Sequence, residues 1–326
     1  MNIRPRRNRK SQSIRELVQE TWLTSKDLLY PLFLVEGEKQ KIPISTMPDV
    51  FRLSLDNILF EIEECLKIGI VAYAIFPAIP EHKKDKYATE SYREGNMYAS
   101  AIYTIKQRFP EIALMTDVAM DPYSSDGHDG LVENGQILND ETLPILAKMA
   151  LVQAQAGADI LGPSDMMDGR VAYLRQALDK AGYSQVSIMS YTAKYASAFY
   201  GPFRDALDSA PKIGDKKTYQ MNPANKREAL REAELDTQEG ADILMVKPAL
   251  AYLDVIHLLK SHTHLPVAAY NVSGEYAMIK FAAQAGCFNE TNAMIEVLTS
   301  IKRAGADIIL TYFAKSAAQY LRSLYL

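Results

Sequence analysis

The sequence predicts a (β/α)8 barrel, the TIM-barrel fold of the α/β class, preceded by an extended N-terminal arm. Short apolar runs alternate with longer amphipathic stretches from about residue 28 to the end, and the apolar runs number eight. Such runs suit parallel strands that are buried on both faces. Eight strand–helix units in a chain of 326 residues favour a closed barrel over an open, doubly wound sheet.

The predicted strands cover residues 29–35, 71–76, 112–118, 160–162, 187–190, 243–246, 267–270 and 308–310. Helical patterns fill the gaps, for example over residues 56–68, 142–156, 170–181, 226–239 and 292–304. A Gly-Ala-Asp-Ile repeat stands where three of these helices give way to strands, at residues 157–160, 240–243 and 305–308. Glycine tolerates the left-handed conformation that ends a helix, so the repeat supports the predicted boundaries. No glycine-rich nucleotide-binding loop is found in the sequence.

Two segments stand outside this alternation. Residues 1–25 precede the first strand and combine a basic run with a helical pattern over residues 14–21, which leaves residues 26–326 for the catalytic barrel. Residues 199–223 are long, rich in glycine, proline and charge, and without a clear period. A long loop inside a compact domain is usually functional or disordered, and here we expect an active-site lid.

The composition is that of an ordinary globular protein, with 48% apolar and 23% charged residues. The net charge of −4 gives no reason to expect nucleic acid or an anionic membrane as a partner. Cys65 and Cys287 are too few and too far apart for a disulfide framework, which indicates a reducing compartment. No apolar run approaches the roughly 20 residues that span a bilayer. The sequence therefore predicts a soluble, cytoplasmic protein.

Two lysines mark the ends of consecutive predicted strands. Lys194 lies just past the fifth strand and Lys247 lies at the end of the sixth. Adjacent barrel strands deliver such residues to the same C-terminal mouth. Burial and a second nearby cation both favour the neutral amine, which is the nucleophile that forms a Schiff base. The alternative for either lysine is a solvated or carboxylate-paired side chain.

Ten motifs carry a resemblance to a known family. They are residues 4–7, 30–33, 117–118, 127–130, 163–170, 189–195, 199–205, 219–220, 244–248 and 270–276. Through them the sequence resembles the porphobilinogen synthase (5-aminolevulinate dehydratase) family over almost its whole length. The resemblance implies a hydro-lyase of tetrapyrrole (haem or chlorophyll) biosynthesis. Such an enzyme joins two 5-aminolevulinate molecules into porphobilinogen with loss of two waters and needs no organic cofactor.

The resemblance also implies roles for individual residues. Lys247 resembles the principal Schiff-base lysine, which holds the first substrate, and Lys194 resembles its partner beside the second. Asp117 and Ser164 belong to the implied substrate site. The implied carboxylate receivers are Ser273 and Tyr312 for the first substrate and Arg204, Lys216 and Gln220 for the second. Lys216 stands where some members have arginine, so the charge is kept but the planar fork is lost.

The segment between residues 117 and 130 bears on metal binding. Zinc-dependent members of the family carry three cysteines there, whereas this sequence has Ala119, Asp121 and Asp129. Because thiolates select zinc and carboxylates suit magnesium or no metal, we expect no catalytic zinc. Asp121 and Asp129, with Asp117, are candidates to hold a hard cation or to orient an amine directly. His128 is a candidate ligand too, although a loop histidine is more often a hydrogen-bonded structural residue.

A separate magnesium site is implied at Glu232, which resembles the residue that holds an allosteric Mg²⁺ in members with this aspartate-rich pattern. Magnesium dehydrates reluctantly, so one carboxylate plus waters is a sensible shell, with Asp168 as an outer-shell candidate. The alternative is a solvated glutamate on a charged helix face.

In the resembled family the N-terminal arm wraps a neighbouring barrel, which implies a homo-octamer.

Two other functions remain open at this point. A class I aldolase also uses a strand-end lysine, but normally only one. A non-catalytic barrel would bind an anionic metabolite through Arg204, Lys216 and Ser273. A lysine pair between two carboxylate receivers favours the condensing enzyme over both.

Overall fold

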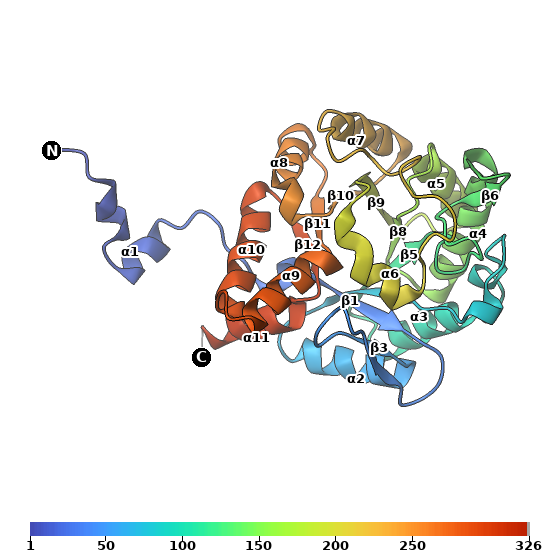
Figure 1. Ribbon diagram of the computed structural model, residues 1–326, viewed down its shortest axis with the longest axis horizontal. Coiled ribbons are helices and arrows are strands. Elements are labelled where there is room, and N and C mark those ends of the chain that lie inside the picture. Colours follow the sequence, from blue (N-terminus) through green and yellow to red (C-terminus); the bar gives the residue numbers. More distant parts are fainter. Residues whose placement is uncertain (325–326) are drawn as a thin grey trace.

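The computed structural model describes residues 1–324, and eight parallel strands form a closed ring in which β12 pairs with β1. The ring strands are β1 (Leu28–Leu34), β4 (Ala72–Pro77), β5 (Ala113–Val118), β8 (Ile160–Pro163), β9 (Ser187–Lys194), β10 (Ile243–Lys247), β11 (Val267–Asn271) and β12 (Ile308–Thr311). In Figure 1 the colours pass around the ring in chain order. The predicted (β/α)8 barrel is therefore confirmed.

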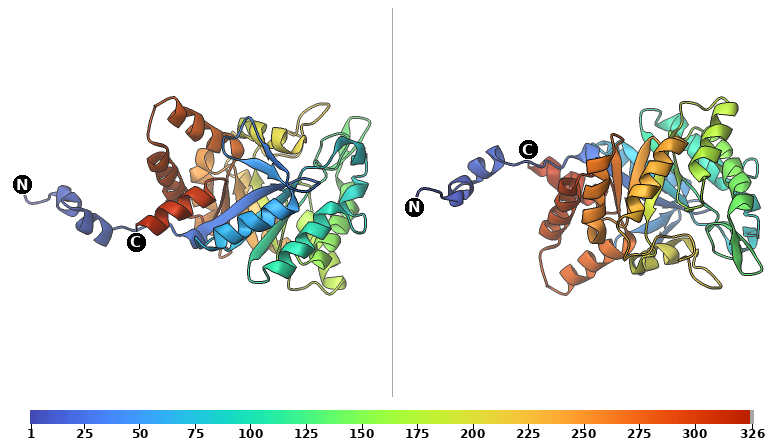
Figure 2. Two further views of the ribbon diagram at one scale, coloured as in Figure 1. Left: turned by 90° about the horizontal axis from the view of Figure 1, so that it is seen from below. Right: turned by 90° about the horizontal axis from the view of Figure 1, so that it is seen from above.

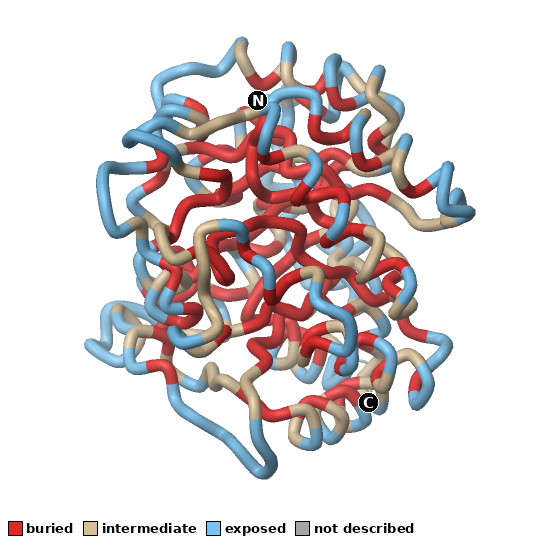
Figure 3. The backbone as a smooth tube through the Cα atoms, turned by 90° about the vertical axis from the view of Figure 1, so that its right-hand side faces the viewer, coloured by how far each residue is buried: buried red, intermediate tan, exposed pale blue. Residues whose placement is uncertain are grey.

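Helices surround the ring (Figure 1), and each of them buries part of its surface. They are α2 (Leu55–Leu66), α3 (Met97–Arg108), α4 (Asn139–Ala156), α5 (Arg170–Lys180), α7 (Glu228–Glu239), α8 (Leu253–His262), α9 (Ser273–Gln284), α10 (Glu290–Ala304) and α11 (Ala314–Ser323). In α2, for example, Ile58, Ile62 and Cys65 are buried at the spacing of one helical turn. Figure 3 shows the resulting buried centre beneath an exposed outer layer.

The Gly-Ala-Asp-Ile repeat forms the turns that lead from α4, α7 and α10 into the next strand. Gly157, Gly240 and Gly305 end these helices with φ of 104°, 100° and 121°. In each copy the aspartate carboxylate accepts a hydrogen bond from a backbone N–H of the preceding ring strand. These bonds join Asp159 to Leu114 at 2.8 Å, Asp242 to Ile188 at 2.7 Å and Asp307 to Val267 at 2.8 Å. The repeat thus fixes the amino ends of the strands, away from the barrel mouth.

Strand β9 is longer than the sequence indicates, and this corrects the position of Lys194. The predicted strand ends at residue 190, whereas β9 continues to Lys194, which is its last residue and does not lie beyond it. The four added residues are buried. Ala193 and Lys194 pair with β10, while Tyr191 and Thr192, which interrupt the apolar run, lie at the irregularity in the pairing. The other seven predicted strands agree with the structure to within one residue at each end.

Short elements decorate the barrel, and the sequence patterns did not predict them. Strand β3 (Phe51–Leu53) extends the sheet beside β1 and pairs with β2 (Lys41–Pro43), while β6 (Leu131–Glu133) and β7 (Gln136–Leu138) form a separate hairpin. Single 3-10 turns are η1 (Pro5–Arg9), η2 (Ser25–Asp27), η3 (Glu81–Lys83), η4 (Thr89–Ser91), η5 (Ala198–Tyr200) and η6 (Leu250–Tyr252).

The segment predicted to be a lid begins with η5 and the short helix α6 (Gly201–Leu207). Phe203 of α6 lies with its ring centroid 5.7 Å from that of Phe33 on β1 and 5.3 Å from that of Phe76 on β4. Because both strand residues are buried at the carboxyl ends of their strands, α6 lies across the mouth of the barrel, as Figure 1 also shows.

Residues 1–20 stand away from the barrel. Figure 2 shows η1 and α1 (Gln12–Leu17) projecting from the body of the molecule in both views. The helix predicted over residues 14–21 therefore starts and ends earlier than expected. Leu17 and Trp22 are 80% and 51% exposed. No helix within residues 1–324 is long and apolar enough to cross a membrane.

Candidate active site

The two predicted lysines face each other at the barrel mouth. Lys194 ends β9 and Lys247 ends β10, and the two residues are direct partners in the strand register. The pairing shifts between Leu244 and Val246, and this irregularity brings the two lysines opposite each other. Each lysine is only 5% exposed. The strand pairing therefore holds two amines side by side in a site from which water is largely excluded.

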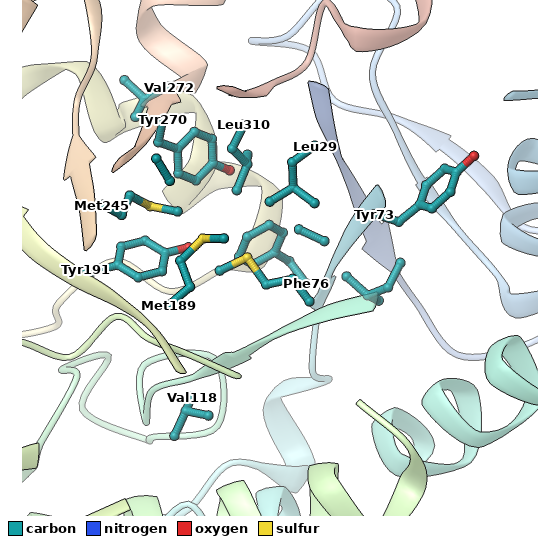
Figure 4. Close-up of a cluster of buried hydrophobic side chains, with 14 of the residues drawn as sticks. Leu29, Tyr73, Phe76, Val118, Met189, Tyr191, Met245, Tyr270, Val272 and Leu310 are labelled. Atoms are coloured by element: carbon teal, nitrogen blue, oxygen red, sulfur yellow. The ribbon is translucent and has the colours of Figure 1, made fainter. Parts of the chain in front are cut away.

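Aromatic rings enclose the amine of Lys247. Its Nζ lies 5.1 Å from the ring centroid of Tyr191, 5.2 Å from Tyr200, 4.8 Å from Phe203 and 4.7 Å from Tyr270. Tyr191 and Tyr270 also belong to the packed interior of the barrel (Figure 4). A ring face attracts a cation by only about 0.5–2 kcal/mol. Removing an ammonium from water costs several kcal/mol, so burial is the larger effect.

Burial, followed by the charge of Lys194, lowers the pKa of Lys247 to about 7, although the three nearby aspartates oppose this shift. A substantial share of the amine is therefore neutral near neutral pH, which nucleophilic attack on a ketone requires. Lys194 has different surroundings, because its Nζ donates a hydrogen bond to the Ser164 carbonyl and lies 3.8 Å from Asp129. The two paired lysines therefore have different surroundings: aromatic rings enclose Lys247, whereas a carbonyl and a carboxylate lie beside Lys194.

Three buried aspartates line the side of the site formed by β5 and the loop after it. Burial and the charge of Asp121 raise the pKa of Asp117 to about 7. The Oδ1 atom of Asp117 has no hydrogen-bond partner among the described residues. Burial also acts to raise the pKa of Asp129, but Lys194 and Lys216 outweigh it and lower that pKa to about 2. Asp117 is therefore suited to exchange protons near neutral pH, and Asp129 to remain charged.

The predicted receivers of the first carboxylate lie beside the lid. Ser273 begins α9 directly after β11, and its Oγ accepts a hydrogen bond from the Phe203 N–H at 2.9 Å and donates to the Phe199 carbonyl at 3.4 Å. Tyr312 follows β12 and shares a hydrogen bond of 2.8 Å with the hydroxyl of Tyr270. Both hydroxyl groups therefore reach the barrel mouth, where Ser273 also fastens the base of the lid.

The predicted receivers of the second carboxylate occupy different surroundings. Arg204 is half-buried on α6, and Gln220 is buried with its Oε1 atom unpartnered among the described residues. The Nζ atom of Lys216 instead lies 3.2 Å from a carboxylate oxygen of Asp121 and 3.2 Å from one of Asp129. The structure thus places Lys216 among the aspartates, a contact that the sequence did not predict.

Glu232 lies on α7, outside the barrel mouth. Together with Asp168, Glu228 and Asn139 it lines a cavity of about 310 Å³. Burial and the charges of the neighbouring carboxylates raise the pKa of Glu232 to about 6, against the opposing charge of Arg170. A cation in this cavity would relieve that repulsion, so the residues fit a hydrated divalent ion. Within residues 1–324, no three His, Cys, Asp or Glu side chains gather closely enough to ligate a metal directly.

Sequence reasoning missed the rings around Lys247 and the particular partners of His128. Tyrosines inside apolar strands look like core residues, and Tyr191 and Tyr270 are indeed both core and site. His128 was expected to be a structural residue or a ligand. Its Nδ1 lies 3.1 Å from the hydroxyl of Tyr219, and its Nε2 lies 2.8 Å from the carbonyl of Ile213, so it contacts the lid.

A closed parallel barrel with a dry, partly neutral lysine beside a second lysine at its carboxyl end defines a Schiff-base-forming barrel enzyme.

Comparison with known proteins identifies the family. A family model described as delta-aminolevulinic acid dehydratase matches residues 2–320. The chloroplastic delta-aminolevulinic acid dehydratase of Physcomitrium patens is 56% identical over 98% of this chain and 74% of that protein. The dehydratase of Bradyrhizobium diazoefficiens is 53% identical over 98% of this chain and 91% of its own length. The chain belongs to the delta-aminolevulinic acid dehydratase family.

A solved structure agrees with this assignment. The crystal structure of the delta-aminolevulinic acid dehydratase (porphobilinogen synthase) from Toxoplasma gondii, in complex with the reaction product porphobilinogen, has a TM-score of 0.96 to this chain. The two are 51% identical over 98% of this chain and 92% of that one. The predicted resemblance to porphobilinogen synthase and the predicted lyase class are thereby confirmed, and the class I aldolase and the non-catalytic barrel are set aside.

The prediction of a cytoplasmic location is wrong by the same comparisons. The relatives from Physcomitrium patens, Selaginella martensii, Glycine max and Oryza sativa are all chloroplastic proteins, although the bacterial relative is nearly as similar. The prediction rested on the lack of a long apolar run and on Cys65 and Cys287, which are free cysteines in the structure. Free cysteines indicate a reducing environment, and such an environment does not distinguish the cytosol from an organelle.

Schiff-base formation at Lys247 should rise with pH up to about 7 and level off above it, because only the neutral amine attacks a ketone. Below that pH the rate should fall by about tenfold per unit. Lys194→Met removes the neighbouring cation and should move the midpoint to higher pH. The measurement is the rate of adduct formation with levulinate and cyanoborohydride, followed by mass spectrometry. Lys260→Met, at the opposite end of the barrel, is the control. An unchanged midpoint in Lys194→Met would contradict the electrostatic role of Lys194.

Proposed function

We propose that the chain condenses two molecules of 5-aminolevulinate to porphobilinogen with Lys247 as the principal nucleophile. The observation that carries this proposal is the difference between the two paired lysines. Lys247 is surrounded by four rings, whereas Lys194 has a carbonyl and a carboxylate beside it. A pyrrole synthase needs one amine that is neutral often enough to attack and a second position for the other substrate.

The first step joins Lys247 to the ketone of one substrate. The neutral amine attacks the carbonyl carbon, water leaves, and the resulting iminium withdraws electrons more strongly than the ketone did. Ser273 and Tyr312 would hold the carboxylate of this substrate by hydroxyl hydrogen bonds. The ring enclosure excludes water that would reverse the step.

The second substrate would lie beside Lys194, with Arg204 and Gln220 as receivers of its carboxylate and with Lys216 adding positive charge on the same side. One carbon–carbon bond and one carbon–nitrogen bond then join the two substrates. The two ketone oxygens leave as two waters, and Lys247 is released unchanged. Asp117, with its raised pKa and unpartnered oxygen, is positioned to move protons during these steps, while Ser164 orients Lys194 through its carbonyl.

Reduction with borohydride in the presence of 5-aminolevulinate should attach substrate to the peptide that contains Lys247. Lys247→Met should lose the adduct and at least about a thousandfold in the rate of pyrrole formation, because no amine remains in the ring enclosure. Mass spectrometry locates the adduct, and an Ehrlich colour assay measures the pyrrole. Lys180→Met, an exposed lysine on α5, should behave as the unaltered chain does. Pyrrole formation by Lys247→Met at the normal rate would refute the assignment.

For the metal, we propose that Mg²⁺ binds through Glu232 and activates the enzyme from outside the active site, with no catalytic zinc. The cavity lined by carboxylates supports a hydrated divalent ion at this place. Asp168, on the same cavity wall, would bind the hydration shell. When bound, the ion would neutralise the clustered carboxylates between α5 and α7 and so stabilise their packing.

Chelation of divalent ions should lower activity about fivefold or more, and added Mg²⁺ should restore it where Zn²⁺ does not. Glu232→Gln should remove this response because its neutral side chain no longer attracts the ion. Steady-state rates at varied Mg²⁺ provide the measurement. Glu234→Gln, an exposed residue on the same helix, is the matched control and should keep the full response. Restoration by zinc alone would contradict the proposal.

For the assembly, we propose that residues 1–25 pack against a neighbouring subunit and support a homo-octamer. The helix α1 has only six residues and exposes Leu17, which is 80% accessible. So short a helix is marginal on its own, which favours a packing partner.

A chain that begins at residue 26 should form assemblies smaller than an octamer, because the arm is proposed to connect subunits. Light scattering after size exclusion measures the mass, and the full chain is the reference. Circular dichroism of the truncated chain checks that the barrel still folds. An octamer formed by a folded, truncated chain would contradict the role of the arm.

A further inference from the structure

Lys216 is a lid residue whose ammonium is buried between two carboxylates. Its Nζ lies 3.2 Å from an oxygen of Asp121 and 3.2 Å from an oxygen of Asp129, and the residue is only 6% exposed. The two aspartates are themselves 7% and 1% exposed. A buried charge is tolerated when it is paired and hydrogen-bonded, and here one cation serves two anions.

The lid reaches this position by docking on residues 126–129. The contacts are a hydrogen bond of 3.1 Å from the Lys212 N–H to the Asp126 carbonyl, and the two contacts of His128 with Ile213 and Tyr219. Gly127 has φ of +70°, and a Cβ there would lie 2.2 Å from the carbonyl oxygen of Ala210. Only glycine therefore allows this approach of the two backbones. The lid and the aspartate-bearing loop fit each other closely. This fit places the side chain of Lys216 between Asp121 and Asp129.

We infer that Lys216 is the counter-cation of Asp121 and Asp129, and that it occupies the place between these carboxylates where a metal ion would otherwise bind. The lid carries this cation, so closure of the lid, and not a bound metal, brings positive charge to the aspartate pair. The inference goes beyond the proposed reaction, because it concerns the charge of the site before any substrate is present.

A divalent ion and Lys216 exclude each other at this position. A hard cation binds carboxylate oxygens at about 2.0–2.6 Å. An ion bound by the same two carboxylates would therefore lie in contact with the ammonium, and the two positive charges would repel each other in surroundings that screen little. Asp121 and Asp129 do not fit a metal ion while Lys216 is present.

Closure of the lid also changes the charge that surrounds Lys194. Asp129 has one oxygen 3.8 Å from Lys194 and the other 3.2 Å from Lys216. With the lid docked, the carboxylate of Asp129 therefore contacts two cations, Lys194 and Lys216. With the lid open, Asp121 and Asp129 would lose their partner and Asp129 would face Lys194 alone. Lys216 is therefore a positioning residue for Lys194. It acts through Asp129, and only when the lid is closed.

Hydrogen exchange of the lid tests the pairing. In the full chain without substrate, Lys216→Met should speed amide exchange in residues 208–220 at least tenfold, because the lid loses its charged contact. Lys216→Arg keeps the charge and should stay within about threefold of the unaltered chain. Asp121→Asn should speed exchange as well, and the double variant with Lys216→Met should exchange no faster than Lys216→Met alone. Lys217→Met is the matched control, because this neighbour is 75% exposed and its one ion pair within residues 1–324 is with Asp215.

Mn²⁺ binding, measured by electron paramagnetic resonance, tests the exclusion of metal. All chains in this experiment carry Glu232→Gln, which removes the proposed outer site. While Lys216 is present, Asp121→Asn should not change the amount of Mn²⁺ bound. Adding Lys216→Met should create Asp121-dependent Mn²⁺ binding, and adding Asp121→Asn should abolish it again.

Unchanged lid exchange in Lys216→Met, Asp121-dependent Mn²⁺ binding beside an intact Lys216, or no gain of binding in Lys216→Met would each overturn the inference. Neither measurement uses substrate, so its failure would leave the proposed condensation to be decided by the trapping experiment.

Discussion

The exclusion of water from the Lys247 amine is the constraint on which the rest of the site depends. An ammonium in an apolar enclosure loses several kcal/mol of hydration, and this loss makes the neutral form available near neutral pH. No single element provides the enclosure. Tyr191 comes from β9 and Tyr270 from β11, while Tyr200 and Phe203 come from the lid. The low pKa of Lys247 is therefore a property of the closed barrel with its lid in place.

The charges around the two lysines are arranged to keep them different. If both amines had the same surroundings, mutual repulsion would lower the proton affinity of each without selecting one of them. Here the carboxylate of Asp129 lies beside Lys194, and the rings lie around Lys247. Because the two strands hold the lysines in register, Lys194 can act as the cation that keeps its neighbour neutral.

The sequence predicts the parts of this structure that depend on local patterns. The barrel strands are short apolar runs, and the glycine–aspartate repeat marks the turns at their amino ends, so both could be found without knowing what packs against them. The two lysines could be found because each follows such a run. The continuation of β9 to Lys194 could not, because Tyr191 and Thr192 break the apolar pattern and the strand resumes its pairing with β10 only at Ala193. The relation of Lys216 to Asp121 joins residues 95 positions apart and depends on how the lid folds back.

This difference follows from how the two ends of the barrel are built. At the amino ends, each aspartate of the repeat accepts a hydrogen bond from the neighbouring strand. A segment of four residues is enough to make this contact, so the same short pattern recurs in the sequence. At the carboxyl ends, the charge of the site is the sum of side chains from several loops. A bound metal would fix that charge whether the site were open or closed. Lys216, which is carried on the lid, adds its positive charge only when the lid closes. The same closure excludes water from the site. The charge balance and the dryness of the site are thereby established in one movement.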